Sequence, residues 1–180
     1  MKKITQSLFI LSIILTGAIA AGVVFKKPDQ ALKEGFKDAG IEIKNVLLDD
    51  GQIKKIEDLS KIKIEDKLVS FYIAKSGGSV EGDAYIDTHL VRTKSETAIY
   101  FISAVGEIDN IIILSFGEPP EYMPTEKWLA LFAGKALGKD ALRLRQDIPN
   151  MTGATMTAKA IIDGARKALA LWKVLFGEKK

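Results

Sequence analysis

The sequence contains no cysteine and only one histidine in 180 residues. The lack of cysteine excludes disulfides, cysteine-ligated zinc, iron–sulfur clusters and the lipid-modified cysteine of lipoproteins. With His89 as the single histidine, a histidine-rich metal site and a bis-histidine haem are excluded within this chain. A long basic run is also missing, because 26 basic and 23 acidic residues are interspersed and leave a net charge of +3. Nucleic acid is therefore not an expected partner.

The N-terminus is the most apolar part of the chain. Two lysines follow the initial methionine, and residues 8–25 are apolar apart from a few glycines and hydroxyl residues. This length is at the lower limit for crossing a bilayer. The sequence Ala18-Ile19-Ala20, however, has the small-residue pattern of a signal-peptide cleavage site. We expect residues 1–27 to be a signal anchor or a signal peptide, with the anchor favoured. In both cases the rest of the protein is exported, either as an extracytoplasmic domain on the cell membrane or as a secreted or periplasmic protein.

The pattern after residue 27 predicts the α+β class. Short helices are expected over residues 28–38 and 53–59, with a strand at 41–46 between them. Strands are then expected at 69–75, 80–92, 97–105 and 109–116, and the short connections between them predict an antiparallel meander. Gly82, inside one of these strands, predicts a bulge or a close approach of two backbones. We therefore expect a meander sheet flanked by helices and preceded by a hydrophobic helix. Residues 28–67 would form an N-terminal α/β portion, and residues 68–180 the core of the domain.

The last third of the chain alternates between loops and helices. Prolines within residues 117–124 predict a rigid, extended loop. Thr125 is expected to cap a helix over residues 126–137 that buries Trp128. A further strand is expected at 141–145. The final helix is expected over residues 157–176, with an apolar face made by Ile161, Ala165, Leu169 and Trp172.

The segment Thr152-Gly153-Ala154-Thr155-Met156-Thr157 lies directly before this final helix. Its glycine and alanine lack bulk, so that a phosphate or a planar group can approach the backbone. Free N–H groups and the dipole at the start of the helix favour an anion, and Thr155 offers a hydroxyl there. The residues alone are better explained by a turn in which a threonine hydroxyl caps the helix.

Two motifs in the chain resemble the FMN-binding domain. The segment is similar to the family signature S/T-G-A-T-x-T/S. The family also has an acidic-Thr-Pro-Gly loop followed by a Trp-x-x-x-Phe-x-Gly-Lys helix, and this chain has Glu118-Pro119-Pro120-Glu121 and residues 128–135 in the same order. The resemblance covers residues 68–176. The domain occurs in the C subunit of the sodium-pumping NADH:quinone oxidoreductase, in the G subunit of the Rnf electron-transport complex and in small exported flavoproteins.

The resemblance implies that FMN is attached covalently, through its phosphate, to the hydroxyl of Thr155. A separate Mg-dependent flavin transferase would load it from FAD, and this chain supplies no catalytic residue or metal ligand. The further cofactor-binding residues that it implies are Thr152, Gly153, Ala154, Thr157, Glu118 and Trp128. Family members carry an aspartate six residues before the acceptor; Pro149 has that place here, and Asp147 lies two residues earlier.

Several of these residues also have an ordinary structural explanation. Glu118 lies on a stiff loop, where a surface carboxylate is as well explained as a flavin contact. The ring of Trp128 is better explained as part of the core than as a stacking partner. His89 is expected to be structural or exposed, and Arg92 to be a solvated charge at the edge of the sheet.

Three functions are consistent with the sequence. The first is a membrane-associated, extracytoplasmic flavoprotein that relays electrons between fixed partners, such as redox proteins or a quinone- or NADH-linked complex. The second is a flavin-dependent reductase of a small extracytoplasmic acceptor. The third is an exported, non-redox binding domain in which the threonine-rich turn is only a helix cap.

Overall fold

The computed structural model describes residues 23–177, and residues 1–22 and 178–180 lie outside the described part. The predicted hydrophobic helix, and nearly all of the predicted signal anchor or signal peptide, fall outside the described residues. Within residues 23–177, no helix combines the length and the apolar character that a membrane span requires.

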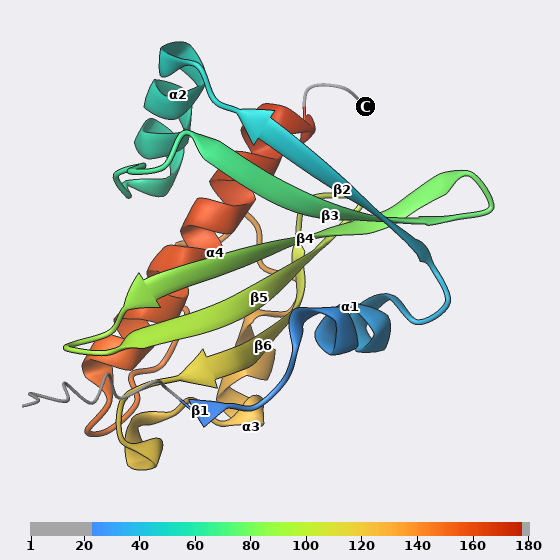
Figure 1. Cartoon of the computed structure of the whole chain (residues 1–180). Helices are drawn as coiled ribbons and strands as arrows, with labels where there is room; N and C mark the ends of the chain where they lie inside the picture. Colours follow the sequence, from blue (N-terminus) through green and yellow to red (C-terminus); the bar gives the residue numbers. More distant parts are fainter. Residues whose placement is uncertain (1–22, 178–180) are drawn as a thin grey trace, which may run out of the picture.

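A six-stranded antiparallel sheet forms the centre of the molecule (Figure 1), with strand order β1-β6-β5-β4-β3-β2. The strands are β1 (Val23–Val24), β2 (Gly40–Leu47), β3 (Leu68–Ser76), β4 (Ser79–Leu90), β5 (Ser95–Ser103) and β6 (Ile108–Phe116). Strands β2 to β6 follow one another in sequence and in space, so the predicted α+β class and meander are confirmed. Val23 and Val24, at the end of the apolar N-terminal segment, form β1 and pair with β6 at the sheet edge.

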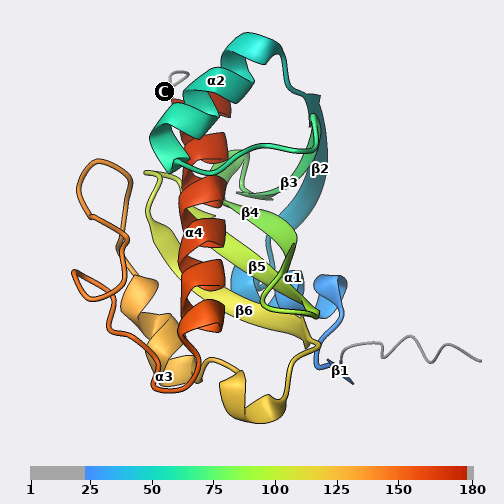
Figure 2. The same cartoon turned by 90° about the vertical axis from the view of Figure 1, so that its left-hand side faces the viewer.

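Helices lie on both faces of the sheet. The helices are α1 (Pro28–Phe36), α2 (Asp50–Ser60), α3 (Glu126–Leu129) and α4 (Thr155–Leu175), with 3₁₀ turns η1 (Pro120–Tyr122) and η2 (Ala130–Phe132). Helix α4 crosses one face of the sheet and α1 covers part of the other (Figure 1). Helix α2 packs against α4, and α3 lies near the N-terminal end of α4 (Figure 2).

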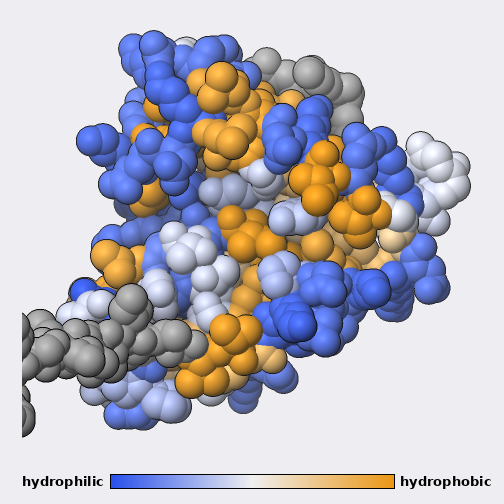
Figure 3. All heavy atoms as spheres, in the orientation of Figure 1, coloured by the Kyte–Doolittle hydropathy of each residue, from blue (hydrophilic) through white to orange (hydrophobic). Residues whose placement is uncertain are grey.

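The alternation of side chains along each strand separates two hydrophobic cores. In β5, Tyr100 points toward α4, whereas Phe101 points toward α1 and meets the ring of Phe36 edge to face. The larger core lies between the sheet and α4. The second, smaller core lies under α1 and leaves part of that face uncovered. Figure 3 shows apolar surface on this face, to which the exposed Ile41 and Ile43 of β2 contribute.

Gly82 lies where two backbones come close, as the sequence predicted. A Cβ at this position would be 2.8 Å from the carbonyl oxygen of Ile102 on the neighbouring strand. The pairing of β3 with β4 also shifts by one residue between Ala74 and Lys75. Gly82 thus lies beside a bulge in the β3–β4 pairing and at a close approach of β4 to β5.

Three sequence-based expectations about loops and helices differ from the structure. The helix expected over residues 126–137 is reduced to α3 and η2, because the chain leaves the helical conformation at Ala133, with ψ 131°, and Gly134 follows with φ +74°. The strand expected at 141–145 is wrong, since Leu142 and Arg145 have positive φ and the segment forms tight turns. The loop at 117–124 is not fully extended, because its second proline begins the turn η1.

Candidate functional site

Thr155 is the first residue of α4, and its side chain is exposed. The helix therefore begins two residues earlier than the sequence predicted. Ala154 is the N-cap residue, and in the described part of the chain no side chain caps the helix there. The alternative in which a threonine hydroxyl caps the helix is thus not what the structure has. The amides of the first turn are left for solvent or an anion.

Gly153 shapes the approach to this helix start. Its φ of +79° is in the left-handed region, which glycine adopts most readily, and a Cβ built there would meet no atom within 4 Å. The surface beside Thr155 is therefore open to a large group. Thr152 is exposed on the same turn, whereas Ala154 and Thr157 are buried. Of the threonines implied as cofactor contacts, Thr152 and Thr155 are accessible.

Asn150 holds the hydroxyl of Thr155. Its side-chain amide Nδ2 donates a hydrogen bond to Thr155 Oγ1 at 3.0 Å. The other atom of that amide, Oδ1, is buried and has no hydrogen-bond partner among the residues that the structure describes. Sequence reasoning did not single out Asn150, because an asparagine in a loop carries no signal of the side chain it will meet.

Trp128 links the preceding helix to this segment. Its ring is buried and packs edge to face on Phe132, with 5.3 Å between centroids. Its indole Nε1 donates to the carbonyl oxygen of Pro149 at 2.9 Å. The structure thus brings Trp128 to the threonine-rich segment, in a packing position that holds the backbone just before Asn150.

Asp147 stabilises the loop that leads into the site. Its carboxylate accepts hydrogen bonds from the amides of Leu142 at 2.8 Å and Arg143 at 2.9 Å, and Lys135 Nζ lies 3.5 Å from it. Burial would raise the pKa of this carboxyl, but the amides of Arg143 and Leu142 outweigh burial and lower it. Both carboxylate oxygens are therefore committed to folding the loop.

Glu118 follows β6, and its side chain reaches the turn between β4 and β5. Its Oε1 accepts hydrogen bonds from the amides of Thr93 at 2.7 Å, Lys94 at 2.9 Å and Arg92 at 3.3 Å. These amides, that of Thr93 foremost, lower the pKa of Glu118. The side chain of Arg92 is exposed on the same turn. The contacts of Glu118 thus explain it as a residue that closes the turn.

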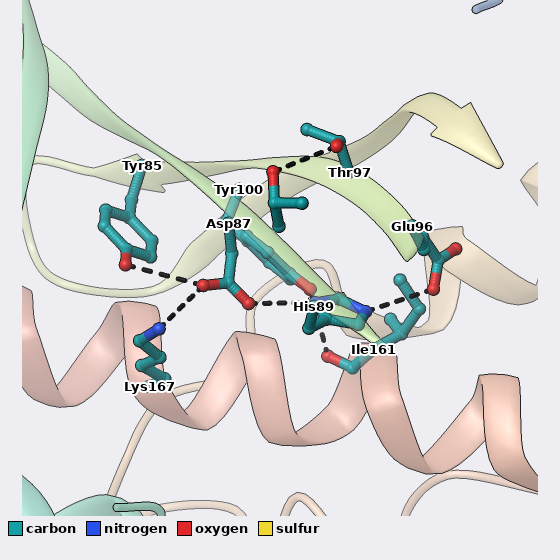
Figure 4. Close-up of polar contacts among 9 residues, drawn as sticks. Tyr85, Asp87, His89, Glu96, Thr97, Tyr100, Ile161 and Lys167 are labelled. Carbon is teal, nitrogen blue, oxygen red and sulfur yellow. Dashed lines mark hydrogen bonds and ion pairs between the residues drawn. The ribbon is translucent and has the colours of Figure 1, made fainter. Parts of the chain in front are cut away.

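A buried charged cluster lies between the sheet and α4 (Figure 4), and sequence reasoning missed it. We define this cluster as Asp87, His89, Glu96 and Lys167. His89 lies between two carboxylates, with Nδ1 2.9 Å from Asp87 and Nε2 3.1 Å from Glu96. Lys167 of α4 lies 2.8 Å from the other oxygen of Asp87. The two-residue spacing of Asp87 and His89 in a strand was a usable signal, because it places both side chains on one face.

Burial and charge together set the protonation of the cluster. Burial alone would lower the pKa of His89, but hydrogen bonds with Asp87 and Glu96 and their negative charges raise it from 6.5 to about 9. Burial raises the pKa of Glu96 and outweighs the opposing hydrogen bond from His89. Oε1 of Glu96 has no hydrogen-bond partner within the described chain. Near neutral pH, His89 is therefore a partly buried cation.

Comparison with known proteins agrees with the sequence motifs. Residues 93–170 match the family model of the FMN-binding domain. The fold is similar to that of NqrC from Shewanella oneidensis, with a TM-score of 0.57 over 83% of this chain and 88% of that chain at 14% sequence identity. No curated protein matches the sequence. The matched region contains Glu118, Trp128 and Thr155, and this part of the chain is similar to an FMN-binding domain.

Proposed function

We propose that this chain is an exported, membrane-associated flavoprotein that relays electrons through FMN attached to Thr155 by a phosphoester bond. The observation that carries the proposal is the position of Thr155. Its hydroxyl is exposed at the uncapped start of a 21-residue helix, beside an open glycine turn. A phosphate held there would meet the free amides and the positive end of the helix dipole.

The residues around Thr155 fit such a group. The exposed hydroxyl is accessible to a separate transferase, as loading by another enzyme requires. Gly153 leaves space beside the backbone, and Asn150 has an unsatisfied buried acceptor that a donor could fill. When bound, FMN supplies the electron transfer, while the protein fixes its place and orientation. A covalent bond suits a relay, because the group cannot diffuse away between two fixed partners.

The location and partners belong to the same proposal. Lys2 and Lys3 are followed by residues 8–22, which are apolar apart from glycines and hydroxyl residues, and this pattern supports export and association with the membrane. The domain would then stand on the extracytoplasmic side, where it meets a flavin transferase, redox proteins or a quinone- or NADH-linked respiratory complex.

The attachment is tested with two substitutions of the acceptor. Full-length protein is co-expressed with a flavin transferase, and flavin that survives acid denaturation is measured by fluorescence and intact mass. Thr155→Ser keeps a hydroxyl and is expected to be loaded, whereas Thr155→Val keeps the shape and is expected to carry none. Thr88→Val, on the sheet face opposite α4, is the matched control. Flavin retained on Thr155→Val would refute attachment at this residue.

A separate measurement distinguishes a relay from a reductase. A relay is expected to accept electrons from a soluble donor once per bound flavin and to pass them on only to a suitable protein or quinone partner. Repeated turnover of a small soluble acceptor by the purified chain alone would instead support the reductase. A wild-type protein that stays colourless in the presence of transferase would favour the non-redox binding domain.

A further inference from the structure

We propose that Asn150 is a positioning residue that orients the Thr155 hydroxyl for flavin transfer, an inference that rests on the proposed function. The contact that carries it is the hydrogen bond of 3.0 Å from Asn150 Nδ2 to Thr155 Oγ1. This bond holds the hydroxyl oxygen of an otherwise exposed side chain. It fixes one of the oxygen lone pairs and leaves the hydroxyl proton free to point toward solvent.

The backbone around Asn150 is held on both sides. The carbonyl of Pro149, the residue before it, accepts the indole N–H of Trp128 at 2.9 Å. The carbonyl of Met151, the residue after it, accepts the amide of Ala154 at 3.0 Å. The amide group of Asn150 is therefore presented to Thr155 from a fixed segment, which limits the rotation of the hydroxyl before any partner arrives.

The transfer step shows what this hydrogen bond does. Thr155 Oγ1 forms a bond to the phosphorus that carries the riboflavin part of FAD, the bond from that phosphorus to the bridging oxygen breaks, and AMP leaves. The hydroxyl proton passes to a base of the transferase, and no electrons are exchanged. Negative charge develops on Oγ1 as the proton departs. A donor already aimed at Oγ1 stabilises that charge without reorganisation.

A neutral donor suits this place better than a carboxylate does. A carboxylate has no proton to donate to Oγ1 and would repel the incoming phosphates. Asp147, the nearest carboxylate along the segment, is committed to the amides of Leu142 and Arg143. Asn150 is thus the group that the fold places on the nucleophile. The Oδ1 atom of Asn150 is buried without a hydrogen-bond partner among the described residues, so the cost of removing this atom from water is not offset by a hydrogen bond.

The test measures the loading reaction itself. Full-length wild type, Asn150→Ala and Asn150→Asp are incubated with FAD, Mg²⁺ and flavin transferase, and kcat and KM for the protein substrate are measured. Both variants are expected to lower kcat by about 10-fold or more, the effect of losing one hydrogen bond to a developing charge, with little change in KM. Gln146→Ala, exposed in the same loop, is the control and is expected to load as wild type does.

Each other result has a defined meaning. Wild-type kcat in Asn150→Ala would overturn the inference, and a change confined to KM would make Asn150 a recognition residue instead. Faster loading of Asn150→Asp would show that an acceptor is required, which contradicts the donor assignment. Failure of the wild type to load would refute the proposed function rather than this inference.

A second readout needs neither FAD nor transferase. In the unloaded protein, the side-chain amide protons of Asn150 are expected to shift in the NMR spectrum of Thr155→Val and to keep their position in Thr155→Ser. Circular dichroism checks that every variant is folded. Identical Asn150 amide signals in wild type and Thr155→Val would show that the hydrogen bond does not form in solution.

Discussion

The indole N–H of Trp128 donates a hydrogen bond of 2.9 Å to the carbonyl oxygen of Pro149. The contact joins α3, which carries one of the two family motifs, to the backbone three residues before the other motif. The resemblance suggested that both motifs belong to one site, and this bond gives the physical link. Through this hydrogen bond, Trp128 fixes the backbone of Pro149, the residue directly before Asn150.

Trp128→Phe tests this link. Phenylalanine keeps an aromatic ring in the core but cannot donate to Pro149, so that a carbonyl loses its partner. We expect the free energy of unfolding to fall by about 1 kcal/mol, which is typical of one hydrogen bond plus a modest loss of packing. Urea unfolding measures this change. The rate of flavin loading is expected to fall as well; an unchanged loading rate with lowered stability would show that the segment does not depend on the bond.

Glu118→Gln tests whether this carboxylate closes the β4–β5 turn. Glutamine keeps the shape but loses the negative charge that attracts the amides of Thr93 and Lys94. We expect faster hydrogen exchange at these two amides, with little change in FMN content. Glu121→Gln, an exposed residue on the same loop, is the control. Loss of flavin in Glu118→Gln, with unchanged amide exchange, would restore Glu118 as a flavin contact.

The strands could be predicted because their signals are local. Alternation of apolar residues located β3 to β6, and Gly82 marked the close approach to Ile102. The turns at residues 141–145 could not be predicted, because the carboxylate of Asp147 stabilises them by capping two amides. The spacing of apolar residues carries no information about a hydrogen bond between a carboxylate and backbone amides.

The charged cluster was missed for a different reason. Asp87 and Lys167 are separated by 80 residues, so only the packing of α4 on the sheet brings them together. His89 looked isolated because its second partner, Glu96, lies across a hairpin whose register the sequence does not specify. A histidine two residues from a carboxylate on one strand face can therefore meet a second carboxylate on the next strand.

The pKa of His89 predicts how stability changes with pH. It is raised from 6.5 to about 9 in the folded state. Folding therefore favours the protonated ring, and this stabilisation is complete below pH ~6.5 and is lost as the pH rises through about 9. The ring of His89 contacts the carboxylates of Asp87 and Glu96 from the sheet, and Asp87 is in turn contacted by Tyr85 of the sheet and Lys167 of α4 (Figure 4).

We expect the free energy of unfolding of the wild type to fall between pH 6.5 and 9, by no more than about 3 kcal/mol. His89→Gln keeps hydrogen bonding but cannot be protonated, so its stability should be lower at pH 6 and nearly constant over the same range. Urea unfolding at several pH values measures both. A wild-type profile that rises from pH 6.5 to 9 would contradict the protonated state.

Lys167→Met tests the ion pair that ties α4 to the sheet. Lys167 lies 2.8 Å from Asp87, and the side chain of Asp87 is only 6% exposed. Removing the cation leaves a nearly buried carboxylate with His89 as its remaining charged partner. We expect the free energy of unfolding to fall by about 1–3 kcal/mol, less than for a fully buried pair because the Lys167 side chain is 25% exposed.

Lys159→Met on the same helix is the matched control. Lys159 pairs with Asp163, but its side chain is 69% exposed. We therefore expect this substitution to change the free energy of unfolding by less than about 0.5 kcal/mol. Equal effects of the two substitutions in urea unfolding would show that the cluster does not hold α4 against the sheet.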